Sequence, residues 1–227
     1  MIRTILFDLD GTLADTEPLH YVAFAETLRP EGIELSREEY FSRLIGFNDH
    51  DCFETVLTEN GKDASAERIE ALIERKAARY QEMIHNRDVM YPGAADFVRE
   101  CAARFPLMIV TGTLREEAEM ILRRAGLREL FLDIVAAEDV EHGKPEPDGF
   151  VVALGRLGFL LRQRDAIEPA QALVIEDTAA GIEAGRRAGM RVLALRQTAP
   201  EADLAAADLI RASFADTDLD DIVRRLA

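Results

Sequence analysis

Cysteine, basic residues and long apolar runs are scarce in this chain of 227 residues, and each scarcity excludes a class of protein. Cys52 and Cys101 are too few for a disulfide framework and lack metal-site spacing, so we expect two buried thiols. No apolar run approaches the ~20 residues of a membrane span. The apolar run between Arg3 and Asp8 is too short for a signal peptide. We therefore expect a soluble cytoplasmic protein that has no membrane partner.

The shortage of basic residues argues against a nucleic-acid partner. The chain has 27 Lys and Arg against 43 Asp and Glu, and its net charge is −16. Nucleic-acid binding requires clustered positive charge. The sequence also lacks the glycine-lysine pattern of a nucleotide P-loop. We interpret the acidity as a solvated surface.

Short apolar runs alternate with helical patterns over most of the chain, and 48% of its residues are hydrophobic. This alternation predicts a parallel sheet with helices on both faces. The expected strands cover residues 4–7, 107–110, 133–136, 173–175 and 192–195. Helical patterns cover residues 116–125, 150–157 and 179–188.

One long interval carries helical periodicity and no strand pattern. It includes an amphipathic repeat from Ile69 to Ile84 and a capping-box pattern at Ser36 and Glu39. We expect an α/β protein with a Rossmann-like, doubly wound core domain in residues 1–15 and 87–227. Residues 16–86 form an inserted α-helical cap domain in this prediction.

Asp8 and Asp10 follow the first predicted strand, where it meets a glycine turn. Side chains two apart on a strand point the same way, so the two carboxylates begin close together. Ligands of open α/β sheets bind at this carboxyl end of the strands. Because Gly11 is at the fourth position, the segment does not fit a calcium loop, whose glycine is sixth. The pair indicates a carboxylate nucleophile beside a hard metal ion.

Three further motifs lie at or near predicted strand ends. Thr111-Gly112-Thr113 opens a helix and offers an anion site, although either threonine could simply cap that helix. Lys144-Pro145 lies in a stiff loop, and a surface charge is the alternative for its lysine. Asp148 can cap the helix after this loop. Glu176-Asp177 would complete an oxygen-rich pocket suited to Mg²⁺, although Asp177 could instead cap a helix.

The four motifs, in this order, resemble those of the haloacid dehalogenase superfamily, and the resemblance covers nearly the whole chain. By this resemblance, Asp8 is a nucleophile that accepts the phosphoryl group, and Asp10 is the general acid and base. Asp8, the Asp10 backbone carbonyl and Asp177 would bind Mg²⁺, with Glu176 supporting Asp177. Thr111 and the Gly112 amide would bind phosphate. Lys144 would offset the charge of Asp8, and Asp10 indicates phosphoryl transfer, since the dehalogenases proper lack this aspartate.

The chain looks most similar to the phosphoglycolate phosphatase and β-phosphoglucomutase branch with a helical cap. Thr16, His20 and Lys76 match residues of that branch that would face the site on cap closure. Alternatively, Thr16 caps a helix and Lys76 is a surface charge. The mutases carry a phosphate-gripping arginine three residues after the cap glycine Gly46. Here that position is Asp49.

The resemblance therefore implies a Mg²⁺-dependent phosphatase for a small phosphorylated metabolite, working through an aspartyl phosphate. A sugar phosphomutase is the first alternative. A non-catalytic binding or regulatory protein on the same fold is a remote one. Both a monomer and a homodimer stay open.

Overall fold

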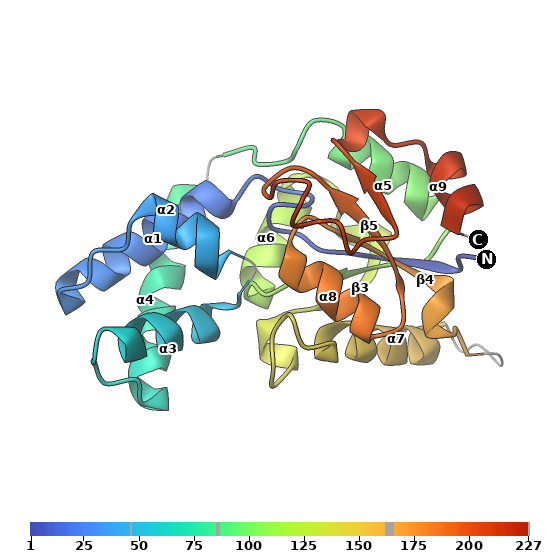
Figure 1. The fold of residues 1–227 in the computed structure, drawn as a ribbon. Coiled ribbons are helices and arrows are strands. Elements are labelled where there is room, and N and C mark those ends of the chain that lie inside the picture. Colours follow the sequence, from blue (N-terminus) through green and yellow to red (C-terminus); the bar gives the residue numbers. More distant parts are fainter. Residues whose placement is uncertain (46, 85–86, 162–165, 227) are drawn as a thin grey trace. The chain divides into compact units, whose positions relative to one another are not determined.

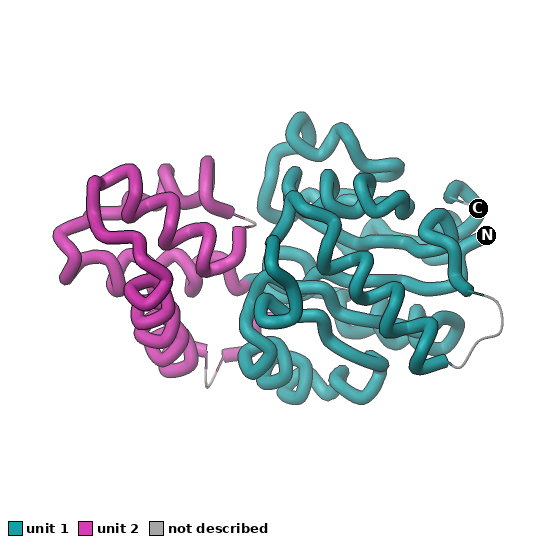
Figure 2. The backbone as a smooth tube through the Cα atoms, turned by 90° about the horizontal axis from the view of Figure 1, so that it is seen from below, with its two compact units in different colours: residues 1–15, 90–227 teal, residues 16–89 magenta. Residues whose placement is uncertain are grey.

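The computed structural model describes residues 1–45, 47–84, 87–161 and 166–226, which form two compact units. The core unit combines Met1–Asp15 with Met90–Ala227, and the helical unit is Thr16–Val89 (Figure 2). The helical unit thus ends at Val89, whereas the sequence pattern placed its end at residue 86, outside the described residues.

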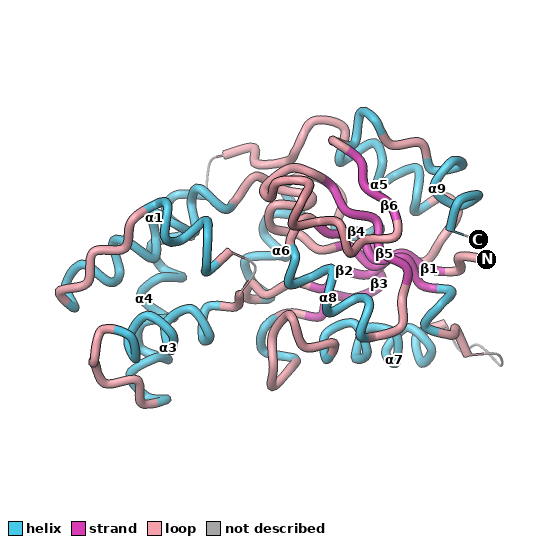
Figure 3. Tube along the Cα trace, viewed as in Figure 1, coloured by secondary structure: helices cyan, strands magenta, loops and turns pink. Residues whose placement is uncertain are grey.

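The described part of the core unit contains a six-stranded parallel sheet in the order β3-β2-β1-β4-β5-β6 (Figure 3). Its strands are β1 (Thr4–Phe7), β2 (Leu107–Val110), β3 (Phe131–Val135), β4 (Ala172–Glu176), β5 (Arg191–Leu195) and β6 (Leu209–Arg211). The predicted α/β fold is confirmed. The short edge strand β6 was not predicted, because its three residues are only half-buried and carry little apolar pattern. The strand order reverses between β1 and β4, the switch point at which such sheets bind ligands.

Helices cover both faces of the sheet (Figure 1). They are α5 (Ala94–Ala102), α6 (Arg115–Arg124), α7 (Asp148–Leu160), α8 (Ala179–Arg187) and α9 (Leu219–Leu226). Strand alternation sends Leu6 into a core cluster with Phe150 of α7 and Ile182 of α8. Phe7 instead meets Phe97 of α5, with ring centroids 6.3 Å apart. The central strands are buried on both faces, which explains their continuous apolar sequences.

Two helix starts differ from the capping that the sequence suggested. Asp148 is the first residue of α7 and Pro147 holds the N-cap position, so the predicted cap at Asp148 is wrong. At α8 the cap is Thr178, whose hydroxyl accepts a hydrogen bond from the Gly181 amide at 3.1 Å. Asp177 therefore does not serve as a helix cap.

The helical unit has an apolar core of its own. It contains α1 (Glu17–Leu28), α2 (Arg37–Glu39), α3 (Asp49–Glu59) and α4 (Ala66–Ile84). Phe24, Phe53 and Leu72 are among the residues of this core. Ser36 caps the short helix α2 by accepting from the Glu39 amide at 3.1 Å. Both cysteines of the chain are buried and free, as expected. Within the described residues, no helix combines the length and apolar character needed to cross a membrane.

Candidate active site

Three carboxylates converge where β1 and β4 end. Asp8 follows β1, and Glu176 and Asp177 stand at the end of β4. The two strands are hydrogen-bonded neighbours in parallel register, so their carboxyl ends coincide. One oxygen from each of the three buried side chains lies within 4.8 Å of the others. The sequence motifs from opposite ends of the chain are thus brought into one acidic cluster.

Lys144 bridges two of these carboxylates. Its ammonium donates to Asp8 Oδ1 and to Glu176 Oε1, both at 2.5 Å, and to the Val110 carbonyl at 3.3 Å. The lysine side chain is only 10% exposed, so the alternative of a solvated surface charge is wrong. A lysine held here offsets the negative charge of the groups that flank it.

Glu176 is fixed by the start of α8. Its Oε2 accepts from the amides of Asp177 and Thr178 at 2.9 and 3.1 Å, and from the Thr178 hydroxyl at 3.0 Å. A Cβ on Gly181 would stand 1.8 Å from Glu176 Oε1, so this position of α8 requires glycine. Glu176 thereby holds the backbone next to Asp177 while its other oxygen binds Lys144.

Asp10 is hydrogen-bonded to the segment after β2. The Thr111 hydroxyl donates to Asp10 Oδ2 at 3.1 Å and accepts from the Thr113 amide at 3.1 Å. The Thr113 hydroxyl donates to the buried Glu117 at 2.7 Å. Neither threonine caps α6, whose N-cap position is Leu114. Gly112 lies between these two threonines.

The carboxylates and the ammonium of the cluster shift one another's pKa values in opposite directions. Burial raises the pKa of Asp8 from 3.8 to about 8; Lys144 lowers this pKa, and Glu176 and Asp10 raise it. Burial, followed by the charges of Glu176 and Asp8, holds the pKa of Asp177 well above its usual range. Burial also lowers the pKa of Lys144, but the carboxylates of Asp8 and Glu176 raise it above its usual value. One ammonium leaves most of this negative charge uncompensated.

The donor set therefore fits a hard divalent cation. Mg²⁺ takes oxygen ligands and commonly uses one or two protein carboxylates. Asp8 and Asp177 supply such oxygens from a buried cluster in which three carboxylates face the single ammonium of Lys144. A cation between them would relieve their mutual repulsion.

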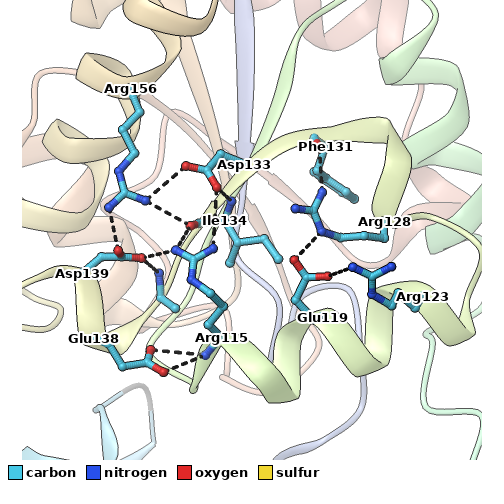
Figure 4. Close-up of polar contacts among 11 residues, drawn as sticks. Arg115, Glu119, Arg123, Arg128, Phe131, Asp133, Ile134, Glu138, Asp139 and Arg156 are labelled. Atoms are coloured by element: carbon cyan, nitrogen blue, oxygen red, sulfur yellow. Dashed lines mark hydrogen bonds and ion pairs between the residues drawn. The ribbon is translucent and has the colours of Figure 1, made fainter.

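A second network of polar contacts holds the start of α6, the helix that follows the Thr111 segment (Figure 4). Arg115, the first residue of α6, donates to Asp139 at 2.5 Å and to the Ile134 carbonyl at 2.6 Å. Arg156 of α7 donates to the other Asp139 oxygen at 2.6 Å. Asp139 thus ties the start of α6 and the middle of α7 to the end of β3.

The helical unit contains a polar cluster of its own. Lys76 of α4 is fully buried and donates to both carboxylate oxygens of Asp49 at 2.9 Å, and to His20 Nδ1 at 2.8 Å. The His20 ring stacks on Tyr80, with centroids 4.2 Å apart. Lys76 is therefore not a surface charge. Thr16 stands at the N-cap position of α1 but its side chain makes no capping bond, so the helix-cap alternative is also wrong.

We expect Asp49→Ala to lower the free energy of unfolding of the helical unit by about 3–5 kcal/mol, because it removes a carboxylate that accepts two hydrogen bonds from the fully buried Lys76 ammonium. Three of the four tyrosines, Tyr21, Tyr40 and Tyr80, belong to this unit and the chain has no tryptophan. Tyrosine fluorescence during urea unfolding therefore measures the effect.

The control for this prediction is Glu54→Ala, which removes an exposed acid from the same helix. It should change the free energy by no more than ~0.5 kcal/mol. Equal stability of the Asp49 and Glu54 variants would contradict a structural role for the buried ion pair.

A sequence profile described as "Haloacid dehalogenase-like hydrolase" matches residues 5–195. The chain belongs to this family. The match includes all four motifs and the helical insertion. The expected assignment to the phosphoric monoester hydrolases of this family is confirmed by its curated relatives. The roles of the site residues named above are proposals.

One relative and one solved structure mention phosphorylated sugars in their names. Fructose-1-phosphate phosphatase YqaB of Escherichia coli is 32% identical over 192 residues, which cover 85% of this chain and 95% of the relative. A structure of variant CbbY from Rhodobacter sphaeroides in complex with xylulose-(1,5)bisphosphate is 31% identical, with a TM-score of 0.82. That alignment covers 95% of this chain and 96% of the other.

A β-phosphoglucomutase from Clostridium difficile shares the fold. Its structure gives a TM-score of 0.87 and covers 100% of this chain, and 97% of its own chain is matched. The identity is 23%, so this likeness shows the fold alone.

Sequence reasoning missed two residues of the site. Gln197 and Thr198 lie after β5; the Gln197 amide donates to two carbonyls of the Asp8 turn, and the Thr198 hydroxyl donates to Asp177. No sequence motif points to these two residues, because a single glutamine and a single threonine in a loop form no recognisable sequence pattern. Only the pairing of β5 with β4 could have placed their loop beside Asp177.

Proposed function

We propose that this protein is a Mg²⁺-dependent phosphatase that hydrolyses a small phosphorylated metabolite, with Asp8 as the nucleophile. The observation that carries the proposal is the bridging of Asp8 and Glu176 by the buried ammonium of Lys144, next to Asp177. Two acids and a fixed cation at a strand end suit phosphoryl transfer, which depends on positioning and charge stabilisation.

In this mechanism an oxygen of Asp8 forms a bond to phosphorus while the bond to the leaving oxygen breaks. Asp10 gives its proton to the leaving oxygen and then takes one from the water that attacks the aspartyl phosphate. That second attack releases inorganic phosphate and restores Asp8. The hydrogen bond from Thr111 to Asp10 supports this assignment, because it ties the acid–base residue to the proposed phosphate-binding segment.

Asp8, the backbone carbonyl of Asp10 and Asp177 would hold Mg²⁺, and Glu176 would support Asp177. The cation supplies charge stabilisation to the phosphoryl oxygens when it is bound. Lys144 contributes positive charge beside Asp8. Thr111 and the Gly112 amide would bind phosphate oxygens.

Phosphorylated sugars are the first substrates to test. The expected result is release of inorganic phosphate from a sugar phosphate such as fructose 1-phosphate, a compound that the name of one relative specifies. The measurement is a phosphate-release assay over a panel of phosphorylated metabolites in Mg²⁺. A panel without any turnover would contradict the phosphatase and favour the non-catalytic alternative.

The sugar phosphomutase is the second candidate. Lys76 disfavours it, because this lysine is already paired with the acid Asp49 inside the helical unit. The mutases carry an arginine at the Asp49 position, and Gly46, which precedes it, lies outside the described residues. Incubation with β-glucose 1-phosphate and a bisphosphate primer separates the two activities, since only a mutase accumulates glucose 6-phosphate.

Thr16, His20 and Lys76 remain candidates for recognising the rest of the substrate, on the strength of the resemblance. Substitution of a substrate-binding residue raises KM for the natural substrate more than KM for p-nitrophenyl phosphate. His20→Gln is the mildest such variant, since it keeps an acceptor close to Lys76. An equal effect on both substrates would remove His20 from the candidates.

A further inference from the structure

Both carboxylate oxygens of Asp177 accept a hydroxyl hydrogen bond. Thr12 donates to Oδ1 at 2.7 Å from the turn after β1. Thr198 donates to Oδ2 from the loop after β5, and its Oγ1 also lies 3.4 Å from the Asp177 carbonyl. Asp177 itself is fully buried. Two donors from separate segments therefore fix the plane of this carboxylate.

The loop after β5 also forms hydrogen bonds to the turn that follows Asp8. Gln197 Nε2 donates to the carbonyls of Gly11 and Thr12, at 3.0 and 2.6 Å. Gly11 has a φ of +80°, and a Cβ there would stand 2.3 Å from Asp177 Oδ2 and 2.9 Å from Thr198 Cγ2. Three chain segments thus meet at Asp177, and a side chain at position 11 would clash with its carboxylate.

We propose that Thr198 is a positioning residue for cation binding, because its hydroxyl fixes the carboxylate of Asp177 in the orientation that binds the cation. The inference rests on the proposed function in one respect, the use of a divalent cation. Each Asp177 oxygen keeps a lone pair after accepting one hydroxyl. Partners that orient a ligating carboxylate typically contribute about 10–100-fold to metal affinity.

Thr198 suits this role because of its place in the fold. β5 pairs with β4 in parallel, so the segments that follow the two strands leave the sheet at the same edge. Thr198 comes three residues after the end of β5, Leu195, and reaches the residue that follows Glu176. Without the hydroxyl, the Oδ2 side of Asp177 would face only a methyl group, and the carboxylate could rotate away from the cation.

The test compares Thr198→Val, which replaces the hydroxyl by a methyl group, with Thr198→Ser, which keeps the hydroxyl. Binding of Mn²⁺ to the substrate-free protein is measured from the electron paramagnetic resonance signal of free Mn²⁺. We expect Kd to rise about tenfold or more in Thr198→Val and by less than about threefold in Thr198→Ser. The Mg²⁺ concentration for half-maximal phosphatase activity should rise in parallel, and kcat at saturating Mg²⁺ should fall less.

The matched control is Thr217→Val. The Thr217 hydroxyl donates to the Ser213 carbonyl at 2.7 Å, in the segment before α9. Circular dichroism checks that each variant is folded, and Thr198→Ala replaces Thr198→Val if the latter is not. Wild-type Mn²⁺ affinity in the folded variant without the hydroxyl would overturn the inference. Equal weakening in Thr198→Ser would do the same.

The binding measurement separates this inference from the proposed function. Weaker Mn²⁺ binding in Thr198→Val, together with a substrate panel that shows no turnover, would uphold the positioning role and reject the phosphatase. Clear turnover with unchanged Mn²⁺ binding would reject the role of Thr198 and leave the phosphatase intact.

Discussion

Asp8→Asn should lower kcat by about four orders of magnitude or more, as expected for removal of an attacking nucleophile. The amide has the shape of the carboxylate but cannot form the aspartyl phosphate. It also still accepts a hydrogen bond from Lys144, whose ammonium lies 2.5 Å from Asp8 Oδ1. The fold should therefore be preserved. Phosphate release from the best substrate of the panel measures the effect, and circular dichroism checks the fold.

A covalent readout sharpens this prediction. After brief incubation with substrate and an acid quench, mass spectrometry should find a phosphoryl group on the Asp8 peptide of the wild type and not of the variant. Asp96→Asn is the control, since the Asp96 side chain is 90% exposed on α5. It should retain wild-type turnover. Undiminished activity in Asp8→Asn would reject the nucleophile.

The parts of the fold that carry a repeating pattern could be predicted from the sequence. The buried strands β1, β2 and β4 read as continuous apolar runs, and α4 reads as a 3.6-residue repeat. Their ends were found within a few residues. The edge strand β6 carries no such pattern, because it is half-buried and short.

The carboxylates of the site were visible from their fixed sequence spacing, whereas the roles of Lys144 and Thr111 were predicted only through the resemblance. Asp8 and Asp10 share one turn, and Glu176 and Asp177 are adjacent, so each pair is visible in the chain. The bond of Lys144 to Asp8 joins residues 136 positions apart, and only the parallel sheet brings them together.

The contacts that hold the site residues in place had no signal in the sequence. The contact between Asp49 and Lys76 involves a position where the resemblance led us to expect an arginine. Thr198 reaches Asp177 through the order of β4 and β5, which no local motif specifies. Asp49 stands where the resemblance led us to expect the arginine of the mutases, and this interpretation stays a prediction. Its bond to Lys76 could not be foreseen, because it depends on how α3 packs against α4.

Removal of divalent cations should lower turnover by about 10³-fold or more, since a bound metal contributes several kcal/mol of transition-state stabilisation. Asp8, Glu176 and Asp177 are buried together with one ammonium. A phosphate group would add further negative charge to the same place. Activity after dialysis against a chelator measures the loss, and added Mg²⁺ should restore the activity.

Stability gives an independent measure of the same cation. Mg²⁺ at about 100 times its Kd should raise the free energy of unfolding by about 2.7 kcal/mol, provided that the unfolded chain does not bind it. The variant Asp177→Asn keeps the hydroxyls of Thr12 and Thr198 beside residue 177. It removes one of the two negative charges that the proposed ligand carboxylates offer to the cation. The free energy of unfolding of this variant should therefore change little when Mg²⁺ is added. Full activity in chelator, with no effect of Mg²⁺ on unfolding, would show that Lys144 alone balances the acids. The buried carboxylates would then act through protonation rather than through a metal.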